Sequence, residues 1–441
     1  MKTLISYTKV VLAVAVIVFA LPLSAKSLRS TITDTKVIKK TFDVNADAQF
    51  NLTGREADIN ITTWNQNKVE VTVTIIVEAF EQEELDKMLD ALVPNITGSR
   101  TNVTVESPPC GQQETVIGNR RRIKMNNEVY KIKSYRFKYD IKMPATNHVN
   151  LKNRFGNVNM DRHTAMVDLE LYECELKGSG INSLSTVANL RFTDGSLGST
   201  KALDLKIYEG DVILQEATAM TLDCKFSNFN ITRVQDANLS AYESNVDLGV
   251  TNIVSAKQNF GKLKIAEAKV LNLKSYELKL EAGQVETLNF SDCKFSKFSF
   301  GQAGKVTVTS AYECTMTIGQ LQSITIDAKF STLNIGQLET SVVLTGYESS
   351  LNIGSVSKNF TKLSVDGKFC SANINLSKGA GYTLNADLSF GSLQFPKENM
   401  ENLKVNKEGN KVSVSGKTRG YNGNTSISLK GYETSVNLTS N

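Results

Sequence analysis

Two adjacent stretches of the chain decide the fold: YECTMTIGQLQSITIDA at residues 312–328 and KFSTLNIGQLETSVVLTG at residues 329–346. Each stretch holds apolar residues at alternate positions on both sides of a Gly-Gln pair. This alternation is the periodicity of a β-strand, and a Gly-Gln pair predicts a turn between two strands. Such pairs recur at Gly283, Gly301, Gly319 and Gly336. Each stretch is therefore expected to contain two or three short strands.

The two stretches belong to two interleaved repeats. One repeat is a Tyr-Glu pair that returns every 34 to 36 residues, at Tyr172-Glu173, Tyr208-Glu209, Tyr242-Glu243, Tyr276-Glu277, Tyr312-Glu313 and Tyr347-Glu348. The other is a basic residue followed by Phe, at Arg154-Phe155, Arg191-Phe192, Lys225-Phe226, Lys294-Phe295, Lys329-Phe330 and Lys368-Phe369. Because the two repeats alternate, the structural unit is about 17 residues long.

A unit of this length with two or three strands is typical of a β-solenoid. We predict an all-β fold, a single-stranded, right-handed β-helix with an N-terminal strand-helix-strand cap. Helical and leucine-rich repeats need apolar patterns that do not occur here. The predicted divisions are a signal peptide at 1–25, the cap with degenerate first coils at 26–147, the regular solenoid at 148–395, and a loop insertion with a closing coil at 396–441.

The first 25 residues predict export. Lys2 and Lys9 accompany an apolar run from Val10 to Leu21, and Ala25 ends a small-residue cleavage site. Cleavage removes two lysines and no acids, so the net charge falls from +5 to +3. This charge is too small to favour a nucleic-acid partner. We expect a monomer in the periplasm or outside the cell, with no transmembrane segment after cleavage.

The open ends of a solenoid expose unpaired backbone and must be covered. Residues 50–52 and 58–61 resemble degenerate first coils, and residues 69–75 alternate as a strand. A helix is predicted from Glu81 to Leu92, with the apolar residues Leu85, Met88 and Leu89 on one face. We expect this helix to belong to the N-terminal cap, and the last Tyr-Glu pair, Tyr432-Glu433, to close the other end.

Alignment of the coils on their apolar residues predicts which side chains stack. It places Tyr over Lys or Arg and Glu over Phe, so Glu313 lies diagonal to Lys294 and Lys329, and Tyr312 stacks on lysine side chains. The structural interpretation is a ladder that fixes the coil register without stacking like charges. The functional interpretation is an outward surface that binds glycan or protein, formed by the six Tyr-Glu pairs with Lys225, Lys294, Lys329 and Lys368.

The spacing of the two repeats leaves open which ladder faces the core. Tyr lies an even number of residues before its apolar triplet and Phe an odd number. A regular strand would therefore bury Tyr and expose Phe, whereas a bulge at the small third position of each repeat would reverse this.

Six cysteines in an exported chain suggest disulfides, but the repeat register argues against them. Three lie at the small position after the aromatic pair and two lie just before a Lys-Phe pair, on coils that are mostly far apart. Coils are spaced about 4.8 Å apart and a disulfide needs Cα atoms within about 7 Å. We predict small buried thiols at Cys174, Cys224, Cys293, Cys314 and Cys370, and a loop thiol at Cys110.

Nothing in the sequence predicts catalysis, a cofactor or a metal. His148 and His163 are the only histidines, and no nucleophile-base spacing or ligand cluster accompanies them. A basic cluster at Arg120, Arg121, Arg122 and Lys124 is expected to be the solvated face of an amphipathic strand pair. The alternative is contact with anionic polysaccharide or lipid headgroups.

Three segments carry a resemblance to a known family: residues 42–71, the strand at 139–144 and the coil at 154–158. In this order they resemble the putative-adhesin family of exported Bacteroidetes β-solenoid proteins, a domain of unknown function. The resemblance spans essentially the mature chain. It implies an exported β-helix whose adhesin label rests on architecture, without an active site.

The sequence thus favours a non-enzymatic exported solenoid that contacts glycans or proteins of the cell envelope or a host. One alternative is a carbohydrate-active enzyme of the parallel β-helix kind, which would need clustered acids or a calcium site and long loops around a cleft. Another is a structural or signalling partner in the periplasm. Fold class alone does not separate these.

Overall fold

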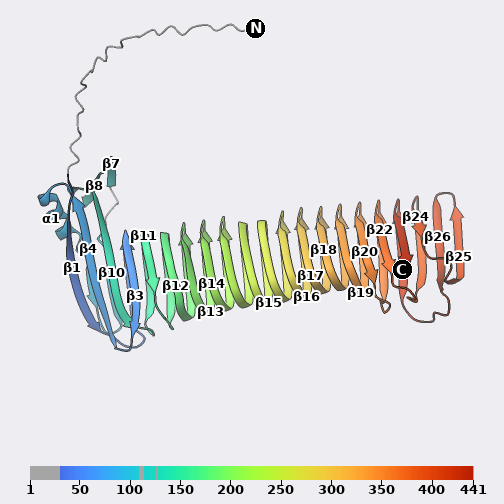
Figure 1. Cartoon of the computed structure of the whole chain (residues 1–441), viewed down its shortest axis with the longest axis horizontal. Coiled ribbons are helices and arrows are strands. Elements are labelled where there is room, and N and C mark those ends of the chain that lie inside the picture. The colour runs from blue at the N-terminus through green and yellow to red at the C-terminus, as the bar shows by residue number, and fades with distance from the viewer. Residues whose placement is uncertain (1–29, 109–113, 126, 441) are drawn as a thin grey trace, which may run out of the picture.

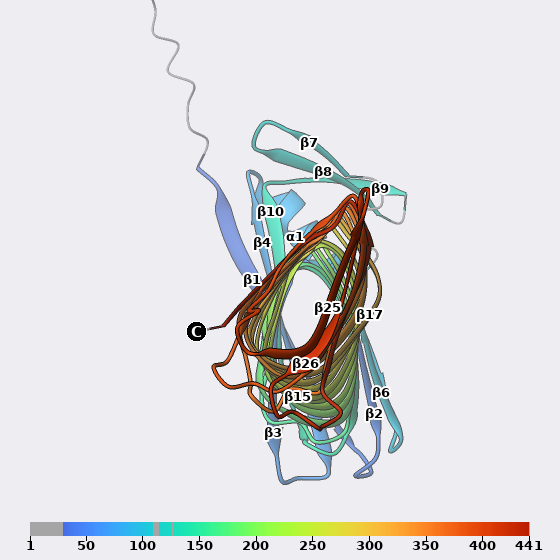
Figure 2. The same cartoon turned by 90° about the vertical axis from the view of Figure 1, so that its right-hand side faces the viewer.

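The computed structural model describes residues 30–108, 114–125 and 127–440, and it is a straight rod wound from β-strands (Figure 1). Of its 28 strands, 25 belong to one continuous sheet. The sheet forms a β-solenoid of about 13 turns, as predicted. Val212 pairs with Phe229 and Leu280 pairs with Phe298, so successive coils are 17 or 18 residues apart. Seen along the axis, the coils superpose around one interior (Figure 2).

The regular coils are built from β11 to β24. Their bounds are β11 (His148–Met160), β12 (Met166–Arg191), β13 (Asp194–Tyr208), β14 (Asp211–Lys225), β15 (Asn228–Tyr276), β16 (Lys279–Lys294), β17 (Lys297–Tyr312), β18 (Thr315–Lys329), β19 (Thr332–Tyr347), β20 (Ser350–Val356), β21 (Lys362–Lys368), β22 (Ser371–Leu376), β23 (Thr383–Ser389) and β24 (Ser392–Gln394). The apolar triplets of each coil point inward and are buried. One core therefore runs the length of the rod.

The Gly-Gln pairs do not separate strands, contrary to the expectation from sequence. Gly319 lies inside β18, and strand pairing continues on both sides of it. A Cβ atom on Gly319 would lie 2.6 Å from the carbonyl oxygen of Gly301 on the neighbouring coil. Glycine is therefore required here because stacked backbones approach closely, and not because the chain makes a tight turn.

Antiparallel strands end the parallel stack on the N-terminal side. The strands of this region are β1 (Ile32–Asp43), β2 (Gln49–Arg55), β3 (Ala57–Trp64), β4 (Lys68–Ala79), β5 (Asn95–Gly98), β6 (Asn102–Glu106), β7 (Glu114–Ile117), β8 (Arg120–Met125), β9 (Glu128–Ile132) and β10 (Ser134–Pro144). The first coil consists of β2 and β3. β10 extends one of its sides in parallel, and β4 and then β1 follow in antiparallel fashion.

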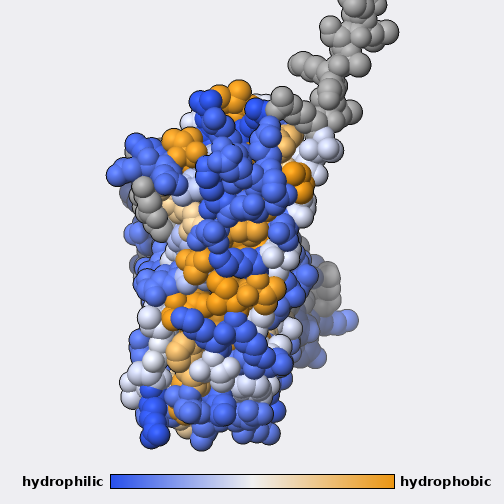
Figure 3. All heavy atoms as spheres, turned by 90° about the vertical axis from the view of Figure 1, so that its left-hand side faces the viewer, coloured by the Kyte–Doolittle hydropathy of each residue, from blue (hydrophilic) through white to orange (hydrophobic). Residues whose placement is uncertain are grey.

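The predicted cap helix is present as α1 (Gln82–Ala91). It contacts β1, β4 and β9, and Leu85, Met88 and Leu89 are buried as expected. α1 has ten residues, and no helix in the described part of the chain has the length and apolar content needed to cross a membrane. Figure 3 shows this end of the rod, where apolar side chains form a band between hydrophilic ones. In β1, Val37 is 62% exposed.

The C-terminal end has a strand order that the sequence did not predict. Its strands are β25 (Met400–Glu408), β26 (Lys411–Thr418), β27 (Ser426–Tyr432) and β28 (Ser435–Ser440). The coil formed by β27 and β28 was expected to close the stack, and this expectation is wrong. β27 pairs with β21 on one side and with β23 on the other, so the last coil lies between two earlier ones. The antiparallel pair β25 and β26 covers the end instead.

Candidate functional site

Each coil turns at one corner through three consecutive residues, which we call the corner triplet. The first residue is mostly Tyr or a basic residue, the second is Glu or Phe, and the third is small. In the triplet Tyr312-Glu313-Cys314 the second residue has a left-handed backbone with φ of 49°. Its N–H donates to the carbonyl of Lys329 on the next coil at 3.0 Å. The ladder of backbone hydrogen bonds therefore continues through the turn.

The left-handed second position recurs along the whole rod with φ between 46° and 66°. It occurs at Glu56, Phe155, Glu173, Phe192, Glu209, Phe226, Glu243, Phe260, Glu277, Phe295, Glu313, Phe330, Glu348, Phe369, Phe390 and Glu433. Glu and Phe rarely adopt this conformation, which costs of order 1–3 kcal/mol. The conformation resolves the question of orientation: both Tyr and Phe point outward, and the small third residue points inward.

The outward rings form one continuous row, which we call the aromatic ridge. Its members in spatial order are Phe155, Tyr172, Phe192, Tyr208, Phe226, Tyr242, Phe260, Tyr276, Phe295, Tyr312, Phe330, Tyr347, Phe369, Tyr432 and Phe390. Neighbouring ring centroids are 5.3 to 5.9 Å apart, and all but the last pair meet edge to face. Edge-to-face pairs contribute about 0.5–1.5 kcal/mol each. The ridge therefore stabilises the stacking of coils.

The predicted ladder register is correct, but its side-chain contacts differ. Tyr312 pairs with Lys294 on one side and Lys329 on the other. The Tyr rings nevertheless pack on Phe rings, because the left-handed residue turns both kinds of ring to the same side. In the described chain, cation–π contacts with ridge rings occur only near the N-terminal end, from Arg55 to Phe155 at 5.2 Å and from Arg154 to Tyr172 at 5.7 Å.

The Glu residues of the ladder remain exposed beside the Tyr rings. A hydrogen bond to the adjacent Glu313 carboxylate, with some desolvation, raises the pKa of Tyr312. The same neighbour effect raises the pKa of Tyr242 and Tyr347. No ion pair joins Glu313 to Lys294 or Lys329 in the described structure; Lys294 pairs with Asp292 at 3.4 Å. The ridge thus presents phenol hydroxyls and exposed carboxylates next to aromatic rings.

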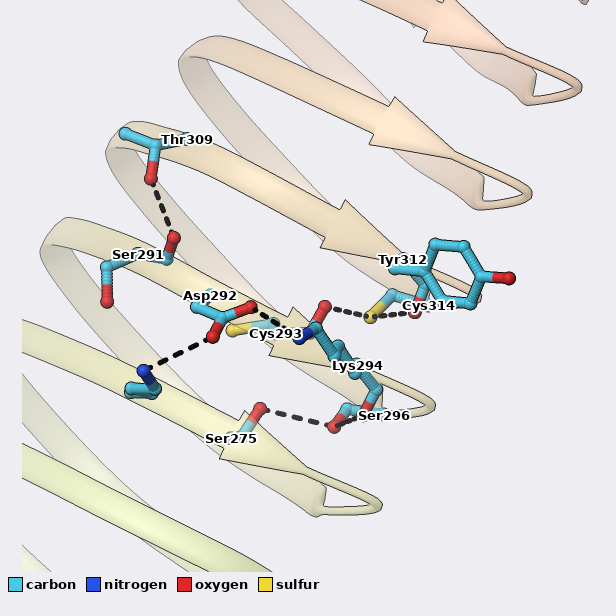
Figure 4. Close-up of polar contacts among 10 residues, drawn as sticks. Ser275, Ser291, Asp292, Cys293, Lys294, Ser296, Thr309, Tyr312 and Cys314 are labelled. Atoms are coloured by element: carbon cyan, nitrogen blue, oxygen red, sulfur yellow. Dashed lines mark hydrogen bonds and ion pairs between the residues drawn. The ribbon is translucent and has the colours of Figure 1, made fainter.

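Inside the corner, the small third residues form a row of buried polar groups. The hydroxyl of Ser331 donates to the carbonyl of Lys329 at 2.8 Å and accepts the N–H of Cys314 at 3.0 Å. Figure 4 shows this corner one coil earlier, where the Tyr312 ring projects outward and the Cys314 sulfur lies against two carbonyl oxygens. These oxygens belong to Cys293 and Tyr312, at 3.3 and 3.4 Å. Cysteine thus substitutes for serine in the row.

The described cysteines are free and buried, which confirms the prediction for Cys174, Cys224, Cys293, Cys314 and Cys370. Burial raises the pKa of each thiol, and for Cys293 it does so to about 11. These thiols therefore remain protonated and unreactive in the folded protein. Cys110 and the predicted signal peptide lie outside the described residues.

The basic cluster divides into a structural arginine and an exposed remainder. Arg121 in β8 donates to both carboxylate oxygens of Glu56 at 2.6 and 2.7 Å and also bonds Glu114. Burial would lower the pKa of Arg121, but its bonds to the two carboxylates outweigh burial and raise it. Arg120 lies over the Phe80 ring at 5.0 Å. Arg122 and Lys124 are exposed.

A cleft opens where the aromatic ridge begins, and the sequence did not single it out. It has a volume of about 670 Å³ and is lined by polar side chains that include Arg55, Lys152, Arg154, Tyr172 and Arg191. We call it the arginine cleft. Arg55, Arg154 and Arg191 occupy the first position of corner triplets, where most later triplets with Phe have lysine instead. The presence of arginine instead of lysine at this position is the sequence feature that could have predicted the cleft.

The two histidines do not form a catalytic pair with any nucleophile. His163 is fully buried, and its Nε2 lies 2.8 Å from the carbonyl oxygen of Asn147. Burial lowers its pKa. His148 is exposed. Among the described residues there is no group of His, Cys, Asp and Glu that could hold a metal ion.

Comparison with known proteins gives distant similarity to solved structures alone. No family model matches the chain, and no curated protein matches it. Among solved structures the chain is similar to a protein from Clostridium sporogenes described as a "putative cell adhesion protein". The two share 9% identity over 92% of this chain and 100% of the other, with a TM-score of 0.19. The predicted resemblance to the Bacteroidetes family stays a prediction.

Proposed function

We propose that this protein is an exported, non-enzymatic binding scaffold whose aromatic ridge binds an extended polysaccharide. The observation that supports this is the ridge itself, a row of fifteen rings in unbroken contact. Eleven of these rings are exposed, by 37 to 56%. Large contiguous apolar patches on a protein surface mark interaction sites.

The chemistry of the ridge matches a sugar chain. The faces of pyranose rings carry C–H groups that pack on aromatic rings, and their hydroxyls need hydrogen-bond partners. The Tyr hydroxyls both donate and accept, and the exposed carboxylates of Glu243, Glu277 and Glu313 accept. Because the rod is long (Figure 1) and the ring contacts follow one another from coil to coil along it, the ridge fits a linear polymer better than a compact ligand. The row repeats along the rod without a focused group of reactive side chains, which favours binding over catalysis.

The test is retention of polysaccharides by affinity electrophoresis, after a glycan array has selected ligands. We expect the double variant Phe226→Ala/Tyr242→Ala to lose most of the retention. The matched control is Ile213→Ala, because Ile213 is 58% exposed but does not belong to the ridge. Equal retention of both variants would contradict the proposal, and so would release of shortened sugar products during incubation. Capture of an envelope protein instead of a glycan would support the alternative that the protein is a structural or signalling partner in the periplasm.

Export forms part of this proposal and has its own test. The predicted signal at residues 1–25 should be absent from the mature protein, whose first residue should be Lys26. Cell fractionation with N-terminal sequencing measures this directly. An intact N-terminus in the cytoplasmic fraction would contradict export.

A further inference from the structure

The arginine cleft breaks the charge pattern of the ridge. Along the regular coils a basic residue at the first triplet position pairs with Tyr on both sides, as Lys329 does with Tyr312 and Tyr347. At the cleft, Arg154 instead pairs with Arg55 on one side and with Tyr172 on the other. Adjacent strands lie about 4.8 Å apart. Two guanidinium groups are therefore held side by side, which is unfavourable unless an anion lies between them.

Glu106 and Glu170 also line the cleft, but within the described residues neither forms an ion pair with its arginines. Lys152 in the same lining is paired with Glu170 at 2.8 Å, whereas Arg55, Arg154 and Arg191 form no ion pair within the described residues. The segment Pro-Cys-Gly-Gln-Gln at 109–113, which follows the lining residue Pro108, has no acidic side chain in its sequence. The lining thus carries four basic side chains against two carboxylates, so a surplus of positive charge remains.

Two buried polar atoms in the lining also have no partner. They are Nε of Arg55, a donor suited to a carboxylate, and Oδ1 of Asn153, an acceptor that only a ligand hydroxyl could satisfy; neither makes a hydrogen bond in the described structure. Buried polar atoms without partners are few in folded proteins and are costly. The volume of about 670 Å³ falls within the range of roughly 300–1,000 Å³ typical of small-ligand sites.

We propose that the arginine cleft binds the carboxylate of an acidic sugar residue, so that the ridge takes a uronic-acid-containing polysaccharide with one acidic unit anchored at Arg154 and Arg191. The planar fork of arginine matches a carboxylate with two parallel hydrogen bonds, which lysine cannot form. Tyr172 belongs both to the cleft and to the ridge. A chain bound along the ridge therefore reaches the cleft directly. This inference rests on the proposed polysaccharide function and specifies its ligand class.

The experiment compares a fluorescent oligomer of a polyuronate with the same oligomer after reduction of its carboxyl groups to hydroxymethyl groups. The readout is the dissociation constant from fluorescence anisotropy. We expect the acidic oligomer to bind at least about tenfold more tightly, and Arg154→Gln and Arg191→Gln each to weaken it roughly tenfold. The control Lys329→Gln changes the same triplet position far along the ridge and should have little effect. Rising salt should weaken only the acidic oligomer.

Equal affinity for the two oligomers, or unchanged binding by both arginine variants, would overturn the inference. If the reduced oligomer binds as tightly as the acidic one and Phe226→Ala/Tyr242→Ala weakens both, the proposed ridge function stands while the charge preference fails. If the acidic oligomer depends on the arginines but not on the ridge, the cleft assignment stands and the ridge function fails. Displacement by equal concentrations of inorganic phosphate or monomeric glucuronate would assign the cleft to free anions and overturn the polysaccharide assignment. Circular dichroism of each variant verifies folding.

Discussion

The ring of Tyr432 contacts the ring of Phe369 with 5.7 Å between centroids, although five other strands lie between β21 and β27 in the chain. On its other side Tyr432 contacts Phe390 at 5.3 Å. Without the last coil, the coils of Phe369 and Phe390 would be neighbours and the alternation of Phe with Tyr would be broken. Insertion of the Tyr432 coil restores it. The last segment of the chain therefore fills a defined gap in the stack.

This arrangement predicts that the last coil locks the C-terminal end. Tyr432→Ala removes two aromatic contacts and should destabilise the end by about 1–3 kcal/mol, at about 0.5–1.5 kcal/mol each. The measurement is hydrogen exchange of β21 and β23, because a solenoid can open locally. Faster exchange should be confined to these two strands and to β27, which contains Tyr432 and pairs with both. Tyr432→Phe keeps the ring and serves as the control; equal protection in all three proteins would refute the prediction.

The row of buried hydroxyls inside the corner gives a second prediction. Ser331→Ala leaves the buried N–H of Cys314 without an acceptor, which costs about 1–3 kcal/mol. Ser331→Cys should cost less, because cysteine occupies the same position at Cys174 and Cys370 and its sulfur bonds the local carbonyl. Thermal unfolding of the two variants measures the difference. If Ser331→Ala is as stable as Ser331→Cys, the hydroxyl row has no role in stability.

Local alternation was enough to predict most of the fold. The 17-residue unit, the buried triplets, α1 and the pairing of Tyr312 with Lys329 all follow from residue types at short range. The left-handed corner was missed because Glu and Phe are not residues that favour positive φ. The different spacings of Tyr and Phe from their apolar triplets, one even and one odd, were the only sign of this corner in the sequence. These spacings indicated a local irregularity of the backbone. In the structure the irregularity lies at the second residue of the triplet, directly before the small third residue.

The inserted coil of β27 and the arginine cleft were not predicted from sequence, because both depend on contacts between segments that are far apart in the chain. The insertion of β27 could be suspected only because Phe390 follows Phe369 with no Tyr-Glu pair between them. The arginine cleft required knowledge that Arg55 pairs with Arg154. Most of the cap lies between Arg55 and Arg154 in the sequence, and no repeat pattern continues through it to relate the two residues. The register of the predicted ladder is confirmed by strand pairing, its contacts between Tyr and lysine side chains are not, and its role in binding stays a prediction.

The buried thiols make stability depend on pH in the alkaline range. Burial raises the pKa of Cys293 to about 11, compared with about 8.5 in an unfolded chain. The unfolded chain therefore loses this proton first, so the contribution of the thiol is complete below about pH 8.5 and is lost as pH rises to about 11. This pKa shift corresponds to a contribution of about 3 kcal/mol from the Cys293 thiol to the free energy of unfolding. The urea concentration at the midpoint of unfolding should therefore decrease as the pH is raised from about 8.5 to about 11.

The variant Cys293→Ala tests the assignment of this effect. Alanine is accommodated, because Cys293 pairs with Ala311 at the same position on the next coil. The variant should show a smaller fall in stability from pH 8.5 to pH 11 than the unmodified protein. A fall of the same size in both proteins would attribute the alkaline loss to other groups, such as the remaining buried thiols.

The last prediction concerns the arginine that joins the projecting β7–β8 hairpin to the first coil. Arg121 bonds Glu56 at the left-handed corner and Glu114 at the start of the hairpin. The side chains of these three residues are 21%, 16% and 12% exposed. Removal of the guanidinium leaves two poorly hydrated carboxylates facing each other. The loss should be about 1–3 kcal/mol, below the 3–5 kcal/mol of a fully buried pair because water still reaches these groups.

Limited proteolysis of Arg121→Ala should therefore cut the hairpin before the rod. Arg122→Ala is the matched control, because Arg122 is exposed and lies one residue further along the same strand. Arg121→Lys should give intermediate protection, since lysine retains the charge but cannot bond both oxygens of Glu56 in a planar fork. Identical cleavage rates for Arg121→Ala and Arg122→Ala would show that the hairpin is held by its strand pairing alone.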